Sequence, residues 1–298
     1  MYPSVPTHPS EELPAPGNNA LHGWPWTEAT DPALYGNGEG WPKISIITPS
    51  YNQGHYLEQT IRSVLAQNYP NLEYMIIDGG STDNSVDLIR KYSSRIHYWV
   101  SEPDKGQSDA LGKGFRLATG ELSAWINSDD FYEAGALYKV AQQYRQQPFS
   151  LLCGTCRMID MDDHLIQKLH TPAISYRSLL RYWKPHFCPP QPSIFFRTEI
   201  LKDLGYFDPS LRYAMDYDLW LKASSKYRFR SIPDNLSYYR IHADSKSGSY
   251  GGLRKFIPEW KRVIERSLHK QSLLTRYAHR LEENLHFFKH RLRQRFAQ

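Results

Sequence analysis

Two acidic clusters, far apart in the chain, carry the residue types best suited to chemistry. The first, at 127–130, follows an apolar run, and the second, at 216–218, precedes one. The first is predicted to lie at a strand end, where Asp129 and Asp130 can hold a divalent cation through oxygen ligands. The second is predicted to begin a helix, a place that favours carboxylates electrostatically, and it can present one of them as a base. A bound cation that stabilises a charged leaving group and a base that accepts a proton are what a group-transfer enzyme needs. The sequence therefore indicates an enzyme.

The composition is typical of a globular protein in a reducing compartment. The chain has 298 residues, of which 40% are hydrophobic and 22% are charged, and these values are ordinary for soluble domains. Its 3 cysteines argue against a disulfide scaffold. Residues 1–31 lack the basic start and apolar run of a signal peptide, and no apolar run reaches the roughly 18 residues that span a bilayer. We therefore expect a cytoplasmic protein.

The pattern of the sequence divides the chain into three parts. Residues 1–42 are rich in Pro and Gly and predict an arm that is either disordered or wrapped over the surface. Residues 43–250 alternate strands and helices and predict one α/β domain. Residues 251–298 predict a basic amphipathic helical extension, with twelve Lys and Arg against four Glu from Arg254 onward. Its apolar stripe consists of Tyr277, Leu281, Leu285, Phe288, Leu292 and Phe296.

The basic extension has two interpretations. It can lie on an anionic membrane surface, apolar stripe down, close to a lipid-linked acceptor and peripheral to the inner membrane face. Alternatively, the stripe packs on the catalytic domain or on a second subunit of a homo-oligomer, which is the more ordinary arrangement. Basic tails also bind nucleic acid, but no recognition module accompanies this one, so we expect no nucleic-acid partner.

Within the α/β domain, the strand ends are predicted to converge. Strands separated by helices imply right-handed crossovers and a mainly parallel sheet, and ligands of such sheets bind beyond the carboxyl ends of the strands. Thr48, Asp78 and the cluster at 127–130 all fall at such ends. The strands are predicted at 44–48, 72–77, 96–100, 123–126, 151–152, 158–159, 193–196 and 236–241.

Seven stretches in a fixed order resemble those of glycosyltransferase family 2, the inverting transferases of the GT-A fold. Each stretch alone is weakly specific, but the set covers residues 43–247. The stretches are ISIITPSYNQGHYL (44–57), SVLAQNYPNLEYMIIDGGSTDNS (63–85), SEPDKGQSDALGKGF (101–115), GELSAWINSDDFY (120–132), QPSIFFR (191–197), MDYDLWLK (215–222) and YYRIHADSKS (238–247).

The resemblance implies both a fold and a reaction. The fold is a Rossmann-like, mixed but mainly parallel sheet flanked by helices, here with a C-terminal helical extension. The reaction moves a sugar, with inversion, from a nucleoside diphosphate sugar to a hydroxyl of a saccharide or glycolipid acceptor, as in cell-surface polysaccharide biosynthesis. The expected cofactor is Mg²⁺ or Mn²⁺, bridging the donor diphosphate.

The resemblance also implies roles for individual residues. Asp129 matches the last acid of the family's D-x-D motif and is expected to hold the metal ion, with Asp130 as a supporting acid and His242 as a further metal contact. Asp216 matches the general base, and Gln191 and Asp218 are expected on the acceptor side. The residues expected around the nucleotide sugar are Thr48, Pro49, Tyr51, Asp78, Asp104, Lys105, Asn127 and Asp129.

Three positions depart from the family pattern. Asn127 replaces the first acid of D-x-D and brings no charge. Gly79 stands where the family often has an acid that reads uracil, so uracil, guanine and thymine all remain candidate bases. Gly112 stands where similar sequences usually have Asn, which leaves the donor sugar open.

Three other interpretations compete with a glycosyltransferase. A sugar nucleotidyltransferase needs a Gly-rich phosphate loop with a basic residue after the first strand, and residues 49–52 do not provide one. A non-catalytic nucleotide-sugar-binding scaffold would keep the fold without the base. A zinc site at Cys153 and Cys156, completed by His186 and Cys188, is disfavoured, because the pair falls on a predicted strand and zinc ribbons usually have two tight Cys pairs.

Overall fold

The computed structural model describes residues 13–17, 21–170, 173–184, 187–246, 248 and 252–296, without the side chains of 252, 253 and 290–296. Some expectations therefore lie outside the described residues. These are the arm at 1–12 and 18–20, His186, and the side chains of Leu292 and Phe296.

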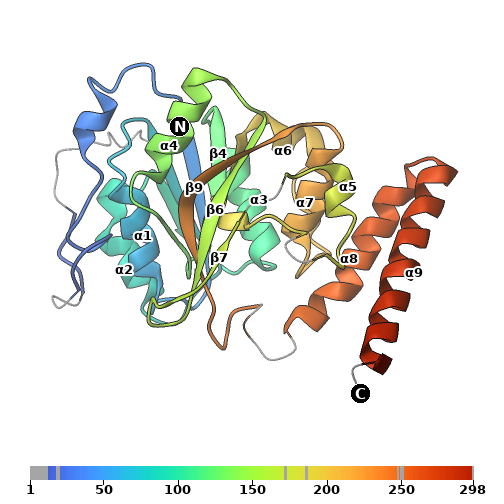
Figure 1. Ribbon diagram of the computed structural model, residues 1–298. Coiled ribbons are helices and arrows are strands. Elements are labelled where there is room, and N and C mark those ends of the chain that lie inside the picture. Colours follow the sequence, from blue (N-terminus) through green and yellow to red (C-terminus); the bar gives the residue numbers. More distant parts are fainter. Residues whose placement is uncertain are drawn as a thin grey trace.

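One mixed sheet lies at the centre of the described structure (Figure 1). Its strands are β1 Ile44–Ser50, β2 Leu72–Asp78, β3 Tyr98–Ser101, β4 Leu122–Trp125, β5 Phe131–Tyr132, β6 Leu151–Ile159, β7 Leu165–Leu169, β8 Ile194–Arg197 and β9 Phe229–Arg240. They run in the order β3-β2-β1-β4-β8-β6-β9-β5, and β7 pairs with β6 beside this path. The first four are mutually parallel, β8 is antiparallel to both neighbours, and β6 is parallel to β9.

Helices cover both faces of this sheet. They are α1 Leu57–Leu65, α2 Ser85–Lys91, α3 Gln107–Leu117, α4 Ala136–Gln146, α5 Tyr176–Leu179, α6 Glu199–Leu204, α7 Met215–Ser224, α8 Gly252–His269 and α9 Leu273–Phe296. Figure 1 shows α1, α2 and α4 on one face, α3, α6 and α7 on the other, and α8 and α9 beyond α7. Among the described residues, no helix is both long and apolar enough to cross a membrane.

The predicted strands are present, with two differences. The stretches 151–152 and 158–159 belong to one continuous strand, β6, which runs between β8 and β9 and is buried along most of its length. The late strand, β9, begins at Phe229, before the predicted 236–241. The helical tail consists of two helices, α8 and α9, which pack side by side (Figure 1).

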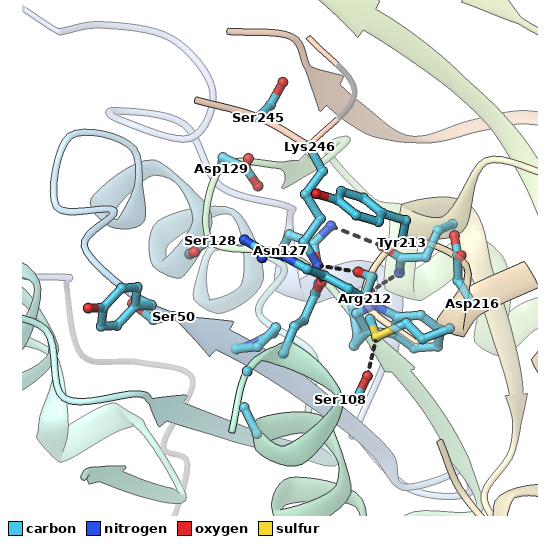
Figure 2. Close-up of a pocket in the computed structure, with 18 of the residues that line it drawn as sticks. Ser50, Ser108, Asn127, Ser128, Asp129, Arg212, Tyr213, Asp216, Ser245 and Lys246 are labelled. Atoms are coloured by element: carbon cyan, nitrogen blue, oxygen red, sulfur yellow. Dashed lines mark hydrogen bonds between the residues drawn. The ribbon is translucent and has the colours of Figure 1, made fainter. Parts of the chain in front are cut away.

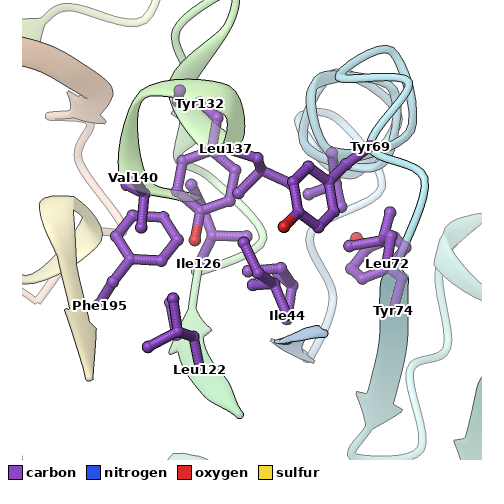
Figure 3. Packing of buried hydrophobic residues seen from close by; sticks show 14 of the residues in the cluster. Ile44, Tyr69, Leu72, Tyr74, Leu122, Ile126, Tyr132, Leu137, Val140 and Phe195 are labelled. Atoms are coloured by element: carbon purple, nitrogen blue, oxygen red, sulfur yellow. The ribbon is translucent and has the colours of Figure 1, made fainter. Parts of the chain in front are cut away.

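The sheet separates two apolar cores, because successive side chains of a strand point to opposite faces. In β1, Ile44 and Ile46 pack with α1 and α4, whereas Ile47 packs with α3. In β4, Leu122 belongs to the first core and Trp125 to the second. Figure 3 shows the first core, in which Ile44 and Leu122 lie with Leu137 and Phe195. This alternation fixes the register in which β1 and β4 end at the same edge.

The described part of the N-terminal arm, residues 13–17 and 21–42, is held by one buried arginine. The Arg62 guanidinium, on α1, donates to the backbone carbonyls of Pro14 (2.6 Å), Pro25 (3.1 Å) and Trp26 (2.6 Å). It also donates to the hydroxyl of Tyr92 (2.9 Å). The described arm therefore lies against the helical face of the domain.

We predict that Arg62→Met lowers the free energy of unfolding by about 2–4 kcal/mol, because it leaves buried carbonyl oxygens without a hydrogen-bond donor. Urea denaturation followed by circular dichroism measures this change. Arg90→Met, on exposed α2, is the matched control and should change stability by less than about 0.5 kcal/mol. Equal effects of the two substitutions would contradict the anchoring role of Arg62.

Candidate active site

A cleft of about 980 Å³ opens at the carboxyl ends of β1 and β4. Its walls come from distant segments, including the loops after β1 and β4, the start of α3, the loop before α7 and residues 244–246. Figure 2 shows Asp129 and Asp216 on two sides of this space, with Arg212 and Lys246 between them in this view. The two acidic clusters of the sequence therefore contribute to one cavity.

The structure brings most of the predicted site residues to the cleft. Those that do not line it are Thr48, Asp78, Asp130, Asp218 and His242. Those that line it are Pro49, Tyr51, Asp104, Lys105, Asn127, Asp129, Gln191 and Asp216.

Asp130 is buried below the cleft and joins two segments of the chain. Its Oδ1 accepts a hydrogen bond from the backbone N–H of Arg240 (2.9 Å), and its Oδ2 accepts one from the Asn127 amide (3.1 Å). Burial, together with the neighbouring Asp129 carboxylate, raises the pKa of Asp130 well above its ordinary value. Predicted as a supporting metal ligand, Asp130 is instead enclosed by protein, where it fixes the ends of β4 and β9.

Asp129 lies at the cleft surface and against His242. Nε2 of His242 is 3.1 Å from Oδ2 of Asp129, and the imidazole packs beside the Tyr56 ring, with 4.8 Å between centroids. Apart from this contact, the Asp129 carboxylate meets no hydrogen-bond donor within the described part of the chain. A carboxylate oxygen at the cleft surface and an imidazole nitrogen buried behind it therefore lie within 3.1 Å of each other.

Thr48 and Asp78 lie beneath the cleft surface. The Thr48 hydroxyl pairs with the Tyr74 hydroxyl at 3.1 Å. Oδ1 of Asp78 accepts from the hydroxyl of Ser81 (2.6 Å), and its Oδ2 accepts from the N–H of Ser81 (2.8 Å) and the hydroxyl of Ser101 (2.7 Å). Asp78 thus holds the loop after β2 in place. Its contact with a nucleotide stays a prediction, and its buried position does not favour that contact.

Asp104 takes the space that Gly79 leaves free. A Cβ on Gly79 would lie 2.8 Å from Oδ2 of Asp104, which is too close for a packed contact. Oδ1 of Asp104 accepts the backbone N–H of Gly106 (2.7 Å). Position 79 therefore has no acid of its own, but the Asp104 carboxylate, from the loop after β3, lies beside it.

Asp216 lies in the first turn of α7, across the cleft from Asp129. Its Oδ1 accepts the backbone N–H of Tyr217 (2.7 Å). Burial raises the pKa of Asp216 above its ordinary value, although this N–H and the charge of Lys246 act in the opposite direction. A carboxylate with a raised pKa is a better proton acceptor, so its position and basicity both suit a general base.

Asp218 lies outside the cleft, contrary to the expectation that it faces the acceptor. Its buried carboxylate pairs with Lys222 (2.6 Å) and with Arg266 of α8 (3.2 Å). Residues two positions apart on an α-helix do not share a face. When Asp216 faces the cleft, Asp218 must therefore face elsewhere.

Lys246 is a cleft residue that the sequence reasoning missed. Its ammonium group donates to the side-chain oxygen of Gln107 (2.6 Å) and to the carbonyl of Arg212 (3.0 Å). Gln107 in turn donates to the Asn127 side chain (2.6 Å). The residue follows His242 in the last of the seven stretches, but its type alone does not distinguish it from a surface lysine.

Glu259, on α8, is a second residue that the sequence reasoning missed. Its carboxylate accepts the backbone N–H groups of Arg212 (3.1 Å), Tyr213 (2.8 Å) and Ala214 (2.9 Å). These residues immediately precede α7, whose N-cap, Ala214, has no capping side chain of its own. A residue of the C-terminal extension therefore caps the helix that carries Asp216.

Two other clusters are separate from the cleft. Asp160, Asp162 and His164 lie within metal-ligating distance of one another, but Asp160 accepts the N–H groups of the other two and so closes the β6–β7 turn. Cys153 and Cys156 are buried on β6, and neither thiol is part of a disulfide.

Comparison with known proteins identifies the family. Residues 45–205 match the family model for glycosyl transferase family 2, which is more than half of the chain. The chain belongs to glycosyl transferase family 2. Its sheet and flanking helices form the GT-A fold expected from the seven stretches, and this confirms both the predicted family and the predicted fold class.

Relatives of this glycosyltransferase include proteins from several bacteria. An uncharacterized glycosyltransferase of Nostoc sp. is 29% identical over 214 residues, 67% of this chain and 65% of the relative, so the match spans just under two thirds of that protein. TuaG of Bacillus subtilis, named as a candidate teichuronic acid biosynthesis glycosyltransferase, is 26% identical over 83% of this chain and 91% of its own length.

Solved structures show the same fold at lower identity. TarS of S. aureus in complex with UDP-GlcNAc has a TM-score of 0.62 at 21% identity, covering 78% of this chain and 68% of that one. The mannosyltransferase PcManGT of Pyrobaculum calidifontis, in complex with GDP-Man and Mn²⁺, has a TM-score of 0.58 at 19% identity, covering 83% and 68%.

We predict that Glu259→Ala frees the amides of residues 212–214, because it removes their common acceptor. Hydrogen–deuterium exchange of the peptides covering the start of α7 should become faster, and the free energy of unfolding should fall by about 1–2 kcal/mol. Glu265→Ala, an exposed residue of the same helix, is the control and should leave these amides protected. Unchanged exchange in Glu259→Ala would exclude the cap.

Proposed function

We propose that this glycosyltransferase moves a sugar, with inversion, from a nucleoside diphosphate sugar to a hydroxyl of a saccharide or lipid-linked acceptor, in cell-surface polysaccharide biosynthesis. The observation that supports this most is the single cleft with Asp129 at one side and Asp216 at the other. An inverting transfer is one displacement, in which the base and the leaving group act from opposite sides of the reacting carbon. Two carboxylates of separate function across one cleft fit that requirement.

Asp216 is the general base of this proposal. As the acceptor oxygen forms its bond to the anomeric carbon, Asp216 takes the hydroxyl proton, and the bond from that carbon to the diphosphate oxygen breaks. The raised pKa of Asp216 improves it as a proton acceptor. Lys246 and Arg212 line the same cleft and place positive charge where a diphosphate leaves.

Asp129 and His242 are the residues proposed to hold Mg²⁺ or Mn²⁺. An oxygen and an imidazole nitrogen suit these ions, and the Asp129 carboxylate is free of other donors in the described chain. When bound, the cation neutralises charge that develops on the leaving diphosphate. The Mn²⁺ and GDP-Man in PcManGT, which shares the fold, support the assignment.

The donor nucleotide is proposed to lie between the loops after β1 and β3. Pro49, Tyr51, Asp104 and Lys105 line this part of the cleft. The Tyr51 side chain is 60% exposed, which leaves its ring free to stack on a base. Asp104 is the carboxylate available to read the base edge, in place of the acid absent at Gly79.

The acceptor is proposed to enter beside Asp216 and Gln191, which both line the cleft. The name of TuaG refers to teichuronic acid biosynthesis, which supports an acceptor belonging to a cell-surface polysaccharide. We propose a cytoplasmic location, peripheral at the inner membrane face, where such acceptors are assembled on lipids.

We predict that Asp216→Asn lowers kcat by about 10²–10⁴-fold, because it removes the proton acceptor. Release of nucleoside diphosphate from a donor and acceptor mixture measures the rate, and Asp87→Asn on exposed α2 is the control. In the wild type, kcat/KM should fall as the pH drops through an apparent pKa above the roughly 3.9 of a free Asp, because the base must be ionised. Full activity in Asp216→Asn would favour a non-catalytic scaffold or another base.

We predict that Mn²⁺ together with UDP, GDP or dTDP raises the melting temperature, since ligands that bind the folded state stabilise it. Asp129→Asn should abolish the increment that depends on Mn²⁺. Asp162→Asn, in the exposed acidic turn, should keep it. If Asp162→Asn lost the Mn²⁺-dependent increment and Asp129→Asn kept it, the metal site would have to be assigned to that turn instead.

A further inference from the structure

Helix α9 turns its polar face toward the domain and its apolar face outward, which is the opposite of the usual arrangement. A surface helix normally buries its apolar face and exposes its polar one. The inner face of α9 contacts α5 and the residues that follow it through polar side chains. Glu282 pairs with Arg177 (2.8 Å) and Arg181 (2.9 Å), and Glu283 accepts the hydroxyl of Tyr182 (2.7 Å).

The inner face also includes a buried histidine. His279 is 9% exposed, and its Nε2 lies 3.0 Å from the carbonyl of Leu180. Its ring packs beside Trp183, with 5.2 Å between centroids. These contacts fix which side of α9 faces the domain.

The opposite face of α9 is an apolar stripe that no described residue covers. Its side chains are between 48% and 78% exposed, and they recur every three or four positions, as one face of an α-helix requires. Figure 1 shows α9 at the outer edge of the molecule, with α8 on its inner side. The outer stripe consists of Leu274, Tyr277, Leu281, Leu285 and Phe288. The described part of the predicted stripe, Tyr277, Leu281, Leu285 and Phe288, therefore does not pack on the catalytic domain, which was one of the interpretations of the extension.

Positive charge flanks the outer stripe. By helical spacing, Arg280 lies at one edge and Lys289 at the other, and both side chains are exposed. Glu282 lies seven residues before Lys289 and therefore on the same edge of the stripe, but its carboxylate is paired with both Arg177 and Arg181. Glu283, on the inner face, accepts from Tyr182. The outer surface of α9 is therefore apolar in the middle and cationic at its margins.

We propose that the outer stripe of α9 docks on an anionic lipid surface. An apolar stripe with basic margins matches an interfacial helix, whose Leu and aromatic side chains enter the acyl boundary while Lys and Arg stay near the headgroups. Each such cation near an anionic surface adds to the attraction.

A second copy of the chain is a poorer occupant of this face. Helix pairs that associate through an apolar seam gain from opposite charges at its margins. Here two copies would bring cationic margins together, because the acids of each α9 are already held by α5 and the residues that follow it. Charge complementarity favours the lipid surface.

Vesicle sedimentation of the full chain tests this proposal. The wild type should sediment with vesicles of equal parts phosphatidylglycerol and phosphatidylcholine, and far less with phosphatidylcholine alone or in high salt. The double variant Leu281→Glu/Leu285→Glu should bind the vesicles with an affinity lower by about tenfold or more. The double variant Arg280→Glu/Lys289→Glu should show a similar loss of affinity. Ile166→Glu, an apolar residue of β7 that is 54% exposed, is the matched control and should bind like the wild type.

Three results would overturn the proposal. They are no binding to phosphatidylglycerol vesicles, binding that Leu281→Glu/Leu285→Glu leaves unchanged, and a wild-type dimer in sedimentation velocity that this variant dissociates. Melting temperatures close to the wild type, expected because the substitutions lie on the outer face, show that each variant is folded. Since the readout is lipid binding, its failure is separate from any failure of the proposed transfer reaction.

Discussion

The buried contact between Asp130 and Arg240 determines the geometry of the donor side of the cleft. Asp130 accepts the backbone N–H of Arg240, while the Arg240 guanidinium donates to the carbonyl of Asp129 (3.1 Å), to Gln59 (2.6 Å) and to Asp163 (2.7 Å). One pair of residues thus joins the end of β4, the end of β9, helix α1 and the β6–β7 turn. The N–H of Arg240 and the Asp130 carboxyl form a buried hydrogen bond, and leaving such a buried group unsatisfied costs about 1–3 kcal/mol, so these segments hold their positions together.

The same contact brings together, from distant parts of the sequence, the two residues proposed to hold the metal ion. His242 follows Arg240 by two residues, and Asp129 precedes Asp130, so the backbone pairing of Arg240 with Asp130 brings the histidine to the acid. The pKa of Asp130 is raised by its burial beside Asp129. Repulsion by the Asp129 carboxylate contributes to that rise, and hydrogen bonds from the Arg240 N–H and the Asn127 amide hold Asp130 in place.

Sequence patterns were sufficient for the sheet and for the convergence of strand ends, because both follow from local alternation and parallel crossovers. They placed Asp129 and Asp216 correctly at the edges of one cleft. They placed both Asp216 and Asp218 at the cleft, whereas only Asp216 lines it, since which side chain faces the cleft depends on the rotation of α7 about its axis. That rotation is set by Arg266 and Glu259, contacts from α8 that no local pattern encodes. The nucleotide contact expected of Asp78 stays a prediction, because a strand-end acid serves a turn as readily as a ligand.

The C-terminal extension contributes to the cleft as well as to the outer surface of the molecule. Through Phe256 and Glu259, α8 contributes a wall of the cleft and the cap of α7, while its outer neighbour α9 presents the apolar stripe. A rigid pair of helices therefore joins the proposed base to the proposed lipid contact. Removing the whole extension would uncap α7 and alter catalysis whether or not α9 meets a membrane. Only substitutions on the outer face of α9 separate the two roles, because they leave α8 and its contacts with the cleft in place.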